Sequence, residues 1–201
     1  MSYPEVVVLT EEPSIKEVIL KIWGKVPDSS EVSLKCIVHE GASDLERSIP
    51  RKLKGWQNPH ARFLILRDND TADCMVRKNK ILALCEAANK HEHCKVRIVC
   101  QELESWFLGD LKAVEDANLA DKAISHKQRH MPYREPDTIQ SPIPKLDALL
   151  KKEIIVSNQK ITIARTIAPH IDVERNLSPS FQNTFSALCR LAGESLQSFS
   201  A

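Results

Sequence analysis

Two aspartates stand two positions apart at the end of a short apolar run. The run covers residues 63–66 (FLIL), and Asp68 and Asp70 follow it. In an extended backbone, side chains two positions apart point the same way, so the two carboxylates would lie close together. Like charges at that distance repel each other unless a cation lies between them, and a divalent metal would meet that need. The alternative is a solvated turn in which Asp-Asn-Asp supplies turn and helix-capping groups.

The elements that must position these aspartates are strands alternating with helices. Hydrophobic runs with the length and composition of buried strands cover residues 5–9, 32–38, 62–67 and 95–100. Stretches with helical periodicity or strong helix formers separate them. This alternation predicts right-handed crossovers and an α/β fold, a mainly parallel sheet with helices on both faces and a helical C-terminal extension.

The first two predicted helices carry capping signals. Ser14 and Glu17 form an S-x-x-E capping box, and Ser43 and Glu46 form a second one. Pro50 lies in the middle of the second helix, where it predicts a kink or a division into two short pieces.

Acidic residues follow three of the four predicted strands. In open α/β sheets, ligands bind outside the carboxyl ends of the strands. Residues distant in the sequence therefore meet at one edge, and the carboxylates expected there are Glu11, Glu12, Asp68, Asp70, Glu102 and Glu104. An alternative for Glu102 and Glu104 is that they favour a helix amino terminus through the helix dipole.

The composition excludes several classes of protein. The chain has 201 residues with 28 Lys and Arg against 27 Asp and Glu, so its formal charge of +1 gives no global attraction for nucleic acid. We find neither a signal peptide nor an apolar run long enough to span a membrane, and we expect a cytoplasmic protein without membrane contact. Six scattered cysteines without a C-x-x-C pair indicate reduced thiols.

The second half of the chain is less regular. Residues 1–116 are expected to form the α/β core, and residues 117–201 a basic loop and C-terminal helices packed on the same domain. The stretch 118–144 contains four prolines and a local excess of basic residues. We expect a solvated loop or a flap over the acidic edge that contacts phosphates.

Oxygen ligands at one sheet edge favour phosphoryl transfer with Mg²⁺ or Mn²⁺. Magnesium uses one or two protein carboxylates together with substrate phosphates, and it can activate water for attack on a phosphodiester. No G-x-x-x-x-G-K-[ST], G-x-G-x-x-G or G-x-S-x-G motif is present, which disfavours P-loop hydrolysis, dinucleotide redox chemistry and serine hydrolysis.

The order of the motifs resembles the Toprim fold of primases, topoisomerases and overcoming-lysogenization-defect nucleases. It is most similar to a bacterial Toprim-related family of unknown function with E-E-P-S, D-x-D, E-x-E-x-W and S-x-S-F motifs, the last of which is found here at residues 178–181. The resemblance implies that Glu11, Asp68 and Asp70 are the catalytic and metal-binding residues. It also implies metal ligation by Glu102 or Glu104 and phosphate contacts by Lys160 or Arg175.

The chain also departs from the nuclease pattern. Glu12 stands where the nuclease relatives have glycine, and Ile15 stands where they have a second acid, so the number of metals stays open. The leading hypothesis is a Mg-dependent phosphodiester hydrolase that acts on DNA or RNA, and the resemblance suggests phage defence as its setting. The alternative is a non-catalytic binding or regulatory subunit with an ATPase partner in an ATPase-linked defence system.

Overall fold

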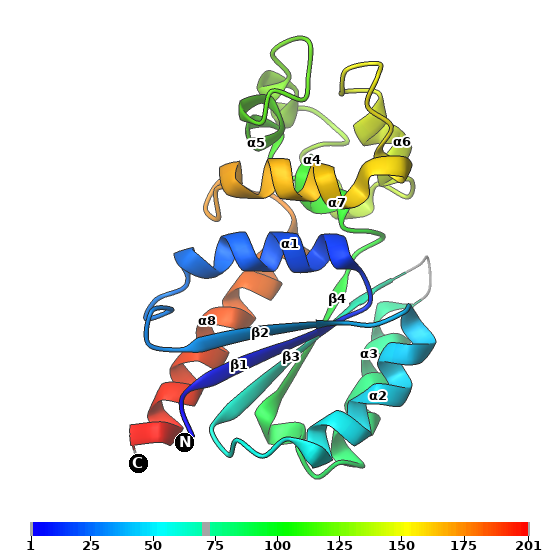
Figure 1. The fold of residues 1–201 in the computed structure, drawn as a ribbon. Helices are drawn as coiled ribbons and strands as arrows, with labels where there is room; N and C mark the ends of the chain where they lie inside the picture. Colours follow the sequence, from blue (N-terminus) through cyan, green and yellow to red (C-terminus); the bar gives the residue numbers. More distant parts are fainter. Residues whose placement is uncertain (1, 70–72, 201) are drawn as a thin grey trace.

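The computed structural model describes residues 2–69 and 73–200, and a four-stranded parallel sheet forms its centre (Figure 1). The strand order is β2-β1-β3-β4, and every neighbouring pair is parallel. This arrangement confirms the predicted α/β fold. The strands are β1 (Glu5–Thr10), β2 (Ser33–Val38), β3 (Ala61–Asp68) and β4 (Cys94–Val99).

Helices cover both faces of the sheet. Their bounds are α1 (Pro13–Ile22), α2 (Ala42–Gly55), α3 (Cys74–Glu86), α4 (Glu104–Leu108), α5 (Leu111–Asp116), α6 (Pro142–Asp147), α7 (Val156–Ile167) and α8 (Pro179–Ser200). Short 3-10 helices are η1 (Trp23–Lys25), η2 (His91–His93), η3 (Ser125–Arg129), η4 (Pro136–Thr138) and η5 (Ala168–His170). None of the helices in the described part of the chain is long and apolar enough to cross a bilayer.

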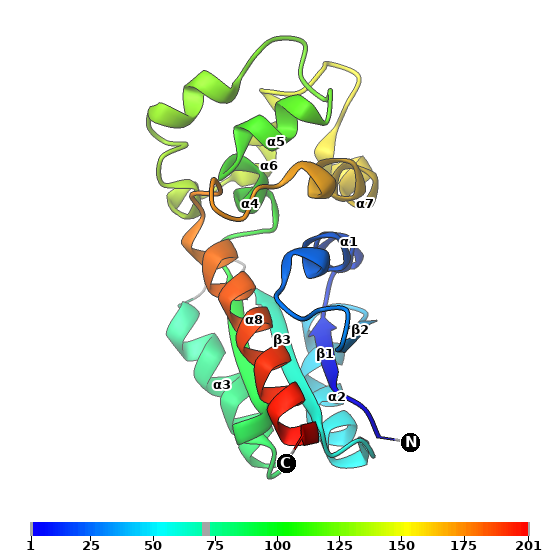
Figure 2. The same ribbon diagram turned by 90° about the vertical axis from the view of Figure 1, so that its left-hand side faces the viewer.

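Alternating side chains of the strands divide the hydrophobic core into two parts. Val7 and Leu9 of β1 point into a core with α2 and α3, while Val6 and Val8 point into a larger core with α1 and α8. Figure 2 shows α8 running along the sheet on the side opposite to α3. The two central strands, β1 and β3, are almost completely buried, as expected for a parallel sheet with both faces covered. The edge strands β2 and β4 are only partly buried.

The predicted helix caps were wrong for the first two helices. Glu12 is the N-cap of α1 and Pro13 its first residue, so the proposed capping box of Ser14 and Glu17 does not form. Proline suits this position because its missing N–H would have no partner there. The second helix begins after Gly41, whose φ of 82° favours glycine, and it has no side-chain cap from Ser43. It continues through Pro50 as one helix.

Residues 104–178 form a helical lobe beyond α1 (Figures 1 and 2). Helix α7 lies against α1, and η5 lies against both α1 and α5. Asp110 caps α5 by accepting a hydrogen bond from Ala113 N. The irregular stretch 118–144 contains η3 and η4, and the predicted boundary at residue 116 falls at the end of α5.

The last helix joins the lobe to the sheet. At its start, Trp106 Nε1 donates to Ser180 Oγ (2.9 Å), and Leu177 N donates to the carbonyl oxygen of Gly109 (2.8 Å). Near its end, Ser195 Oγ accepts from Glu5 N at the beginning of β1 (2.8 Å). These contacts at the two ends of one helix join the lobe to the strands.

Gly109 lies at the tightest point of this junction, and we predict that Gly109→Ala destabilises the protein. An added Cβ would overlap Asn176 Oδ1 and would lie 3.0 Å from Ser178 N, two groups that are hydrogen-bonded to each other. We expect a loss of about 1–3 kcal/mol in the free energy of unfolding, measured by urea denaturation.

Gly193→Ala is the matched control for this substitution. Gly193 lies inside α8 with open space around its Cα, so alanine there is expected to stabilise the helix by up to about 1 kcal/mol. Equal effects of the two substitutions would contradict the close packing at Gly109.

Candidate functional site

The carboxyl ends of β1, β3 and β4 bring together most of the predicted acidic residues. Thr10 pairs in register with Leu66, and Asp68 pairs with Val99. Asn69 N extends the ladder by donating to the carbonyl oxygen of Val99 (3.0 Å). Residues that follow these strands therefore share one edge of the sheet, which we call the acidic edge. It comprises Glu11, Glu12, Asp68, Glu102 and Glu104.

Glu11 is held by a buried arginine that sequence reasoning did not single out. Its Oε1 accepts from Arg67 Nη1 (2.6 Å) and from the backbone N–H of Asp68 (2.7 Å). The same arginine nitrogen also donates to the carbonyl oxygen of Asp68 (2.6 Å). Because Arg67 and Glu11 are only 3% and 8% exposed, this pair is a buried charge-assisted contact. It ties the end of β1 to the end of β3.

Asp68 lies next to this pair, and its side chain is buried. Asp70, the second member of the predicted D-x-D pair, lies outside the described residues, so the pairing of the two aspartates stays a prediction. Ile15, which stands where the nuclease relatives have a second acid, is fully buried in the hydrophobic core. It therefore supplies no polar group to the acidic edge.

A second group of charges combines Glu12, Glu104 and Lys160. The Nζ of Lys160 lies 3.3 Å from Glu12 Oε1 and 3.9 Å from Glu104 Oε1. Ser14 Oγ donates to the other oxygen of Glu12 (2.9 Å). Helix α7 has a non-helical residue at Gln159, directly before this lysine. The kink and the packing of α7 on α1 bring Lys160 to the acidic edge, where the resemblance had suggested a phosphate contact.

Glu104 is buried at the first position of α4 and is only 1% exposed. Burial raises its pKa to about 7, although Lys160 opposes the shift, and the nearby Glu102 and Glu12 raise it further. Burial lowers the pKa of Lys160, but the fields of Glu104, Glu12 and Glu102 outweigh this effect and the net shift is upward. Glu104 therefore exchanges a proton near neutral pH while Lys160 keeps its charge.

Several buried polar atoms around this edge have no hydrogen-bond partner among the described residues. They are Thr10 Oγ1, His39 Nε2, Asn69 Oδ1, Glu104 Oε2 and Ser105 Oγ. Buried polar groups in folded proteins are nearly always hydrogen-bonded, and exceptions gather at functional sites. His39 follows β2 directly, and the sequence signal that could have revealed it was a polar residue directly after a predicted strand.

The oxygen-rich edge fits a hard divalent cation in its chemistry. Carboxylates are the ligands that Mg²⁺ and Mn²⁺ prefer, and the buried Glu104 Oε2 offers an acceptor without a donor. Within residues 2–69 and 73–200, however, no three His, Cys, Asp or Glu side chains are placed to hold a metal together. A complete ligand set would thus need Asp70 or a movement of the described carboxylates.

Arg175, the other predicted phosphate contact, lies in the helical lobe and binds Asp110. Its Nε and Nη2 donate to the two carboxylate oxygens of Asp110 at 2.6 and 2.9 Å. Asp110 is fully buried and also caps α5, so this bidentate contact holds the lobe together. The S-x-S-F motif likewise has packing contacts, since Phe181 lies edge-on to Trp106 with ring centroids 5.5 Å apart.

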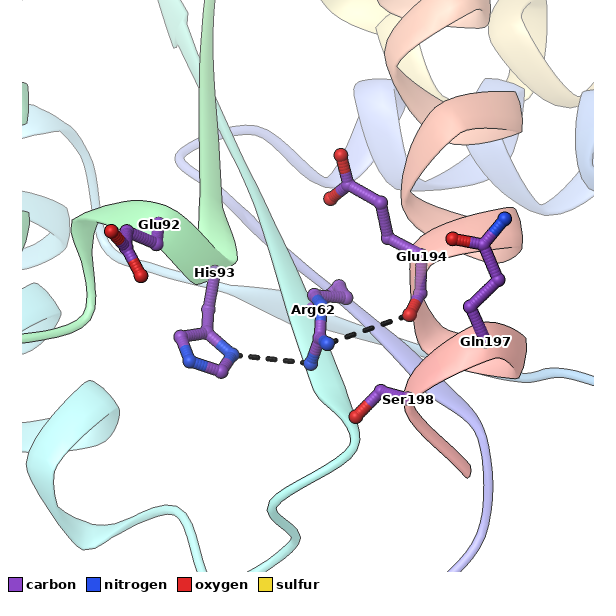
Figure 3. A pocket seen from close by; sticks show the side chains of 6 residues that line it. All are labelled: Arg62, Glu92, His93, Glu194, Gln197 and Ser198. Atoms are coloured by element: carbon purple, nitrogen blue, oxygen red, sulfur yellow. Dashed lines mark hydrogen bonds between the residues drawn. The ribbon is translucent and has the colours of Figure 1, made fainter. Parts of the chain in front are cut away.

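A cavity of about 480 Å³ lies at the opposite end of β3 (Figure 3). Arg62 points into it and donates to His93 Nδ1 (3.1 Å) and to the carbonyl oxygen of Glu194 (3.4 Å). Its guanidinium also donates to the carbonyl oxygens of Pro59 and Ala61 at the start of β3. These contacts link β3 to α8 and η2, so Arg62 has a structural role at this cavity, which lies far along β3 from the acidic edge.

Comparison with known proteins agrees with the fold. The C-terminal region of the Burkholderia pseudomallei OLD protein superposes with a TM-score of 0.52 at 13% sequence identity, covering 93% of this chain and 98% of that one. Comparison with curated proteins gives no match. A family model described as domain of unknown function DUF4276 matches residues 9–188, which include every strand end of the acidic edge. The chain therefore belongs to the DUF4276 family.

Proposed function

We propose that this protein is a metal-dependent phosphodiester hydrolase, a nuclease-like Toprim protein that acts on DNA or RNA. The observation that carries the proposal is the acidic edge itself, where carboxylates follow three neighbouring strands and Arg67 and Lys160 lie among them. Several buried polar atoms there have no hydrogen-bond partner among the described residues. The fold that it shares with the C-terminal region of the OLD protein supports the resemblance to overcoming-lysogenization-defect nucleases. Phage defence is the biological setting that we propose.

Glu11, Asp68 and Asp70 would hold Mg²⁺ or Mn²⁺, with Glu102 or Glu104 as further oxygen ligands. When bound, the cation would neutralise charge on the phosphate and make water a better nucleophile. Arg67 fixes the orientation of the Glu11 carboxylate and balances its charge before any ligand binds. Such preorganisation lowers the cost of assembling the site during the reaction.

Lys160 and Glu104 would act on the phosphate from the side of the helical lobe. The ammonium group of Lys160 would offset the charge of a bound phosphodiester. Glu104, with a pKa of about 7, would accept or release a proton at neutral pH. In the absence of substrate, Glu12 and Glu104 keep the ammonium at the edge.

Removing both aspartates tests the proposal directly. We expect wild-type protein to cleave single- or double-stranded nucleic acid only with Mg²⁺ or Mn²⁺, and the Asp68→Asn/Asp70→Asn variant to lose about 100-fold or more of this activity. Gel-based cleavage assays with labelled DNA and RNA measure the effect. Glu153→Gln, an exposed carboxylate of the lobe, is the control and should retain full activity. Equal cleavage by the double variant would refute the assignment.

The raised pKa of Glu104 makes protein stability depend on pH. The folded chain binds this proton more tightly than the unfolded chain, whose carboxyl titrates near 4.5, so the stabilisation is lost as pH rises towards 7. The free energy of unfolding of the wild type should therefore fall relative to that of Glu104→Gln by about 2.5 kcal/mol between pH 5 and pH 8.

Urea denaturation at several pH values measures this difference. Glu153→Gln is again the control, since an exposed carboxylate should leave the pH profile parallel to that of the wild type. Parallel profiles for wild type and Glu104→Gln would show that Glu104 titrates normally.

A second candidate function is a non-catalytic subunit of an ATPase-linked defence system. The observation that favours it is internal charge pairing, because Arg67 neutralises Glu11 and Lys160 lies between Glu12 and Glu104. These contacts stabilise the edge without a metal. Calorimetry that detects no Mg²⁺ or Mn²⁺ binding, combined with stable co-purification of an ATPase, would favour this function over hydrolysis.

A further inference from the structure

We propose that Cys74 and Cys100 are an oxidation site, where a small disulfide such as oxidised glutathione converts the two thiols into a reversible cross-link that restrains the acidic edge. The cross-link itself is independent of the proposed function, and only its effect on cleavage rests on that function. All six cysteines of the chain are free thiols in the structure.

Two pairs of cysteines lie between helix α3 and strand β4. The helix packs on the strand and runs back along the sheet before β4 begins, so the two elements are antiparallel (Figure 2). The start of α3 therefore lies beside the end of β4. Cys74 is the first residue of α3 and Cys100 directly follows β4, whereas Cys85 and Cys94 lie at the other end of the two elements.

Cys74 and Cys100 line the same cavity, which has a volume of about 320 Å³ and is also lined by Asp137. A hydrogen bond joins the two thiols, and Cys100 forms another with the carboxylate of Asp137. Both cysteines are partly exposed. A small oxidant that enters the cavity therefore meets a thiol whose partner is already in contact with it.

The second pair provides a comparison inside the same protein. A hydrogen bond also joins Cys85 to Cys94, but these residues are only 0% and 4% exposed. Thiol–disulfide exchange needs access of the oxidant to a sulfur atom. We therefore expect oxidation of the pair at the cavity, while Cys85 and Cys94 stay reduced.

Cys74 is the thiol that we expect to react first. It is the first residue of a 13-residue helix, directly after the N-cap Asp73. Backbone N–H groups at a helix N-terminus stabilise a thiolate, which is the attacking form of cysteine. Burial and the charge of Asp137 raise the pKa of Cys100 to about 12, so Cys100 stays protonated and reacts second.

The reaction consists of two exchanges at sulfur. The Cys74 thiolate attacks oxidised glutathione, so a mixed disulfide forms and one glutathione leaves. Cys100 then attacks the Cys74 sulfur and displaces the second glutathione. Two protein thiols are oxidised, one glutathione disulfide is reduced to two thiols, and the protons of both protein thiols end on the released glutathione.

The new bond would close a ring of contacts around Asn69, which directly follows β3 at the acidic edge. Asn69 N donates to the carbonyl oxygen of Val99 (3.0 Å), the residue before Cys100. The carbonyl oxygen of Asn69 accepts from Arg77 Nε (2.7 Å), three residues after Cys74. A covalent link between α3 and β4 would therefore restrain the end of β3. We expect slower cleavage by the linked protein, since active sites adjust during turnover.

Mass spectrometry after oxidation tests the cross-link. Wild-type protein is treated with oxidised glutathione, denatured, alkylated and digested with a protease. We expect the number of alkylated cysteines to fall from six to four, because the bond consumes two of them. A peptide pair that joins Cys74 to Cys100 should appear, and dithiothreitol should remove it.

Three serine variants make the assignment specific. Cys74→Ser should form no cross-link, and Cys100→Ser should stop at the mixed disulfide of Cys74. Cys189→Ser, which removes a partly exposed cysteine of α8, is the matched control and should form the cross-link as the wild type does. Six free thiols in the treated wild type, or a bond between Cys85 and Cys94 in its place, would overturn the inference.

Hydrogen exchange measures the restraint without an assay of activity. The Asn69 amide should exchange on the order of tenfold more slowly in oxidised than in reduced wild type, because the link opposes local opening. Treated and untreated Cys74→Ser should exchange alike. Equal exchange in the two states of the wild type would show that the bond leaves the acidic edge unrestrained.

Cleavage assays of the two redox states separate this inference from the proposed function. A cross-link in a protein that cleaves no nucleic acid would refute hydrolysis and leave the oxidation site in place. Metal-dependent cleavage by a protein that forms no cross-link would do the reverse. Equal cleavage by linked and reduced protein would refute the effect of the bond on the site.

Discussion

The contact between Arg67 and Glu11 is the constraint on which the acidic edge depends. Both side chains are almost completely buried, and an isolated charge at that depth would be costly. One guanidinium nitrogen serves Glu11 and the carbonyl oxygen of Asp68 together, so the carboxylate and the backbone of β3 cannot move independently. The geometry of the edge therefore depends on a charge pair as well as on the hydrogen-bond ladder of the sheet.

The helical lobe completes the edge from the opposite side. Lys160 reaches Glu12 and Glu104 because α7 packs on α1, and Arg165 on the same helix forms an exposed bidentate contact with Glu17. The buried junction at Trp106 and Ser180 fixes where α4 begins, and hence the depth of Glu104. Packing at Trp106 and Ser180, which lie away from the charged residues, therefore contributes to the burial that raises the pKa of Glu104.

Sequence patterns were sufficient for the sheet because buried parallel strands are continuous apolar runs. Because Glu11 and Asp68 directly follow such runs, the sequence predicted them at the carboxyl edge of the sheet. Glu12 and Glu104 were expected near them because they also come shortly after predicted strands. The helix starts were less predictable, since Pro13 at the first helical position overrode the capping signal of Ser14. The Glu12–Lys160 contact spans 148 residues, and no local pattern contains that information. His39 was missed because a single polar residue after a strand is ordinary turn composition.

The late position of α8 in the sequence has a consequence for synthesis of the protein. This helix covers one face of β1, β3 and β4, and Ser195 accepts a hydrogen bond from the first N–H of β1, 190 residues earlier. Ribosomes add about 5–20 residues per second, so β1 waits on the order of 10–40 s for this partner. During that interval the apolar face of the nascent sheet lacks its cover. The protein should therefore fold after translation of α8, and until then it is a natural client for chaperones that bind exposed strands.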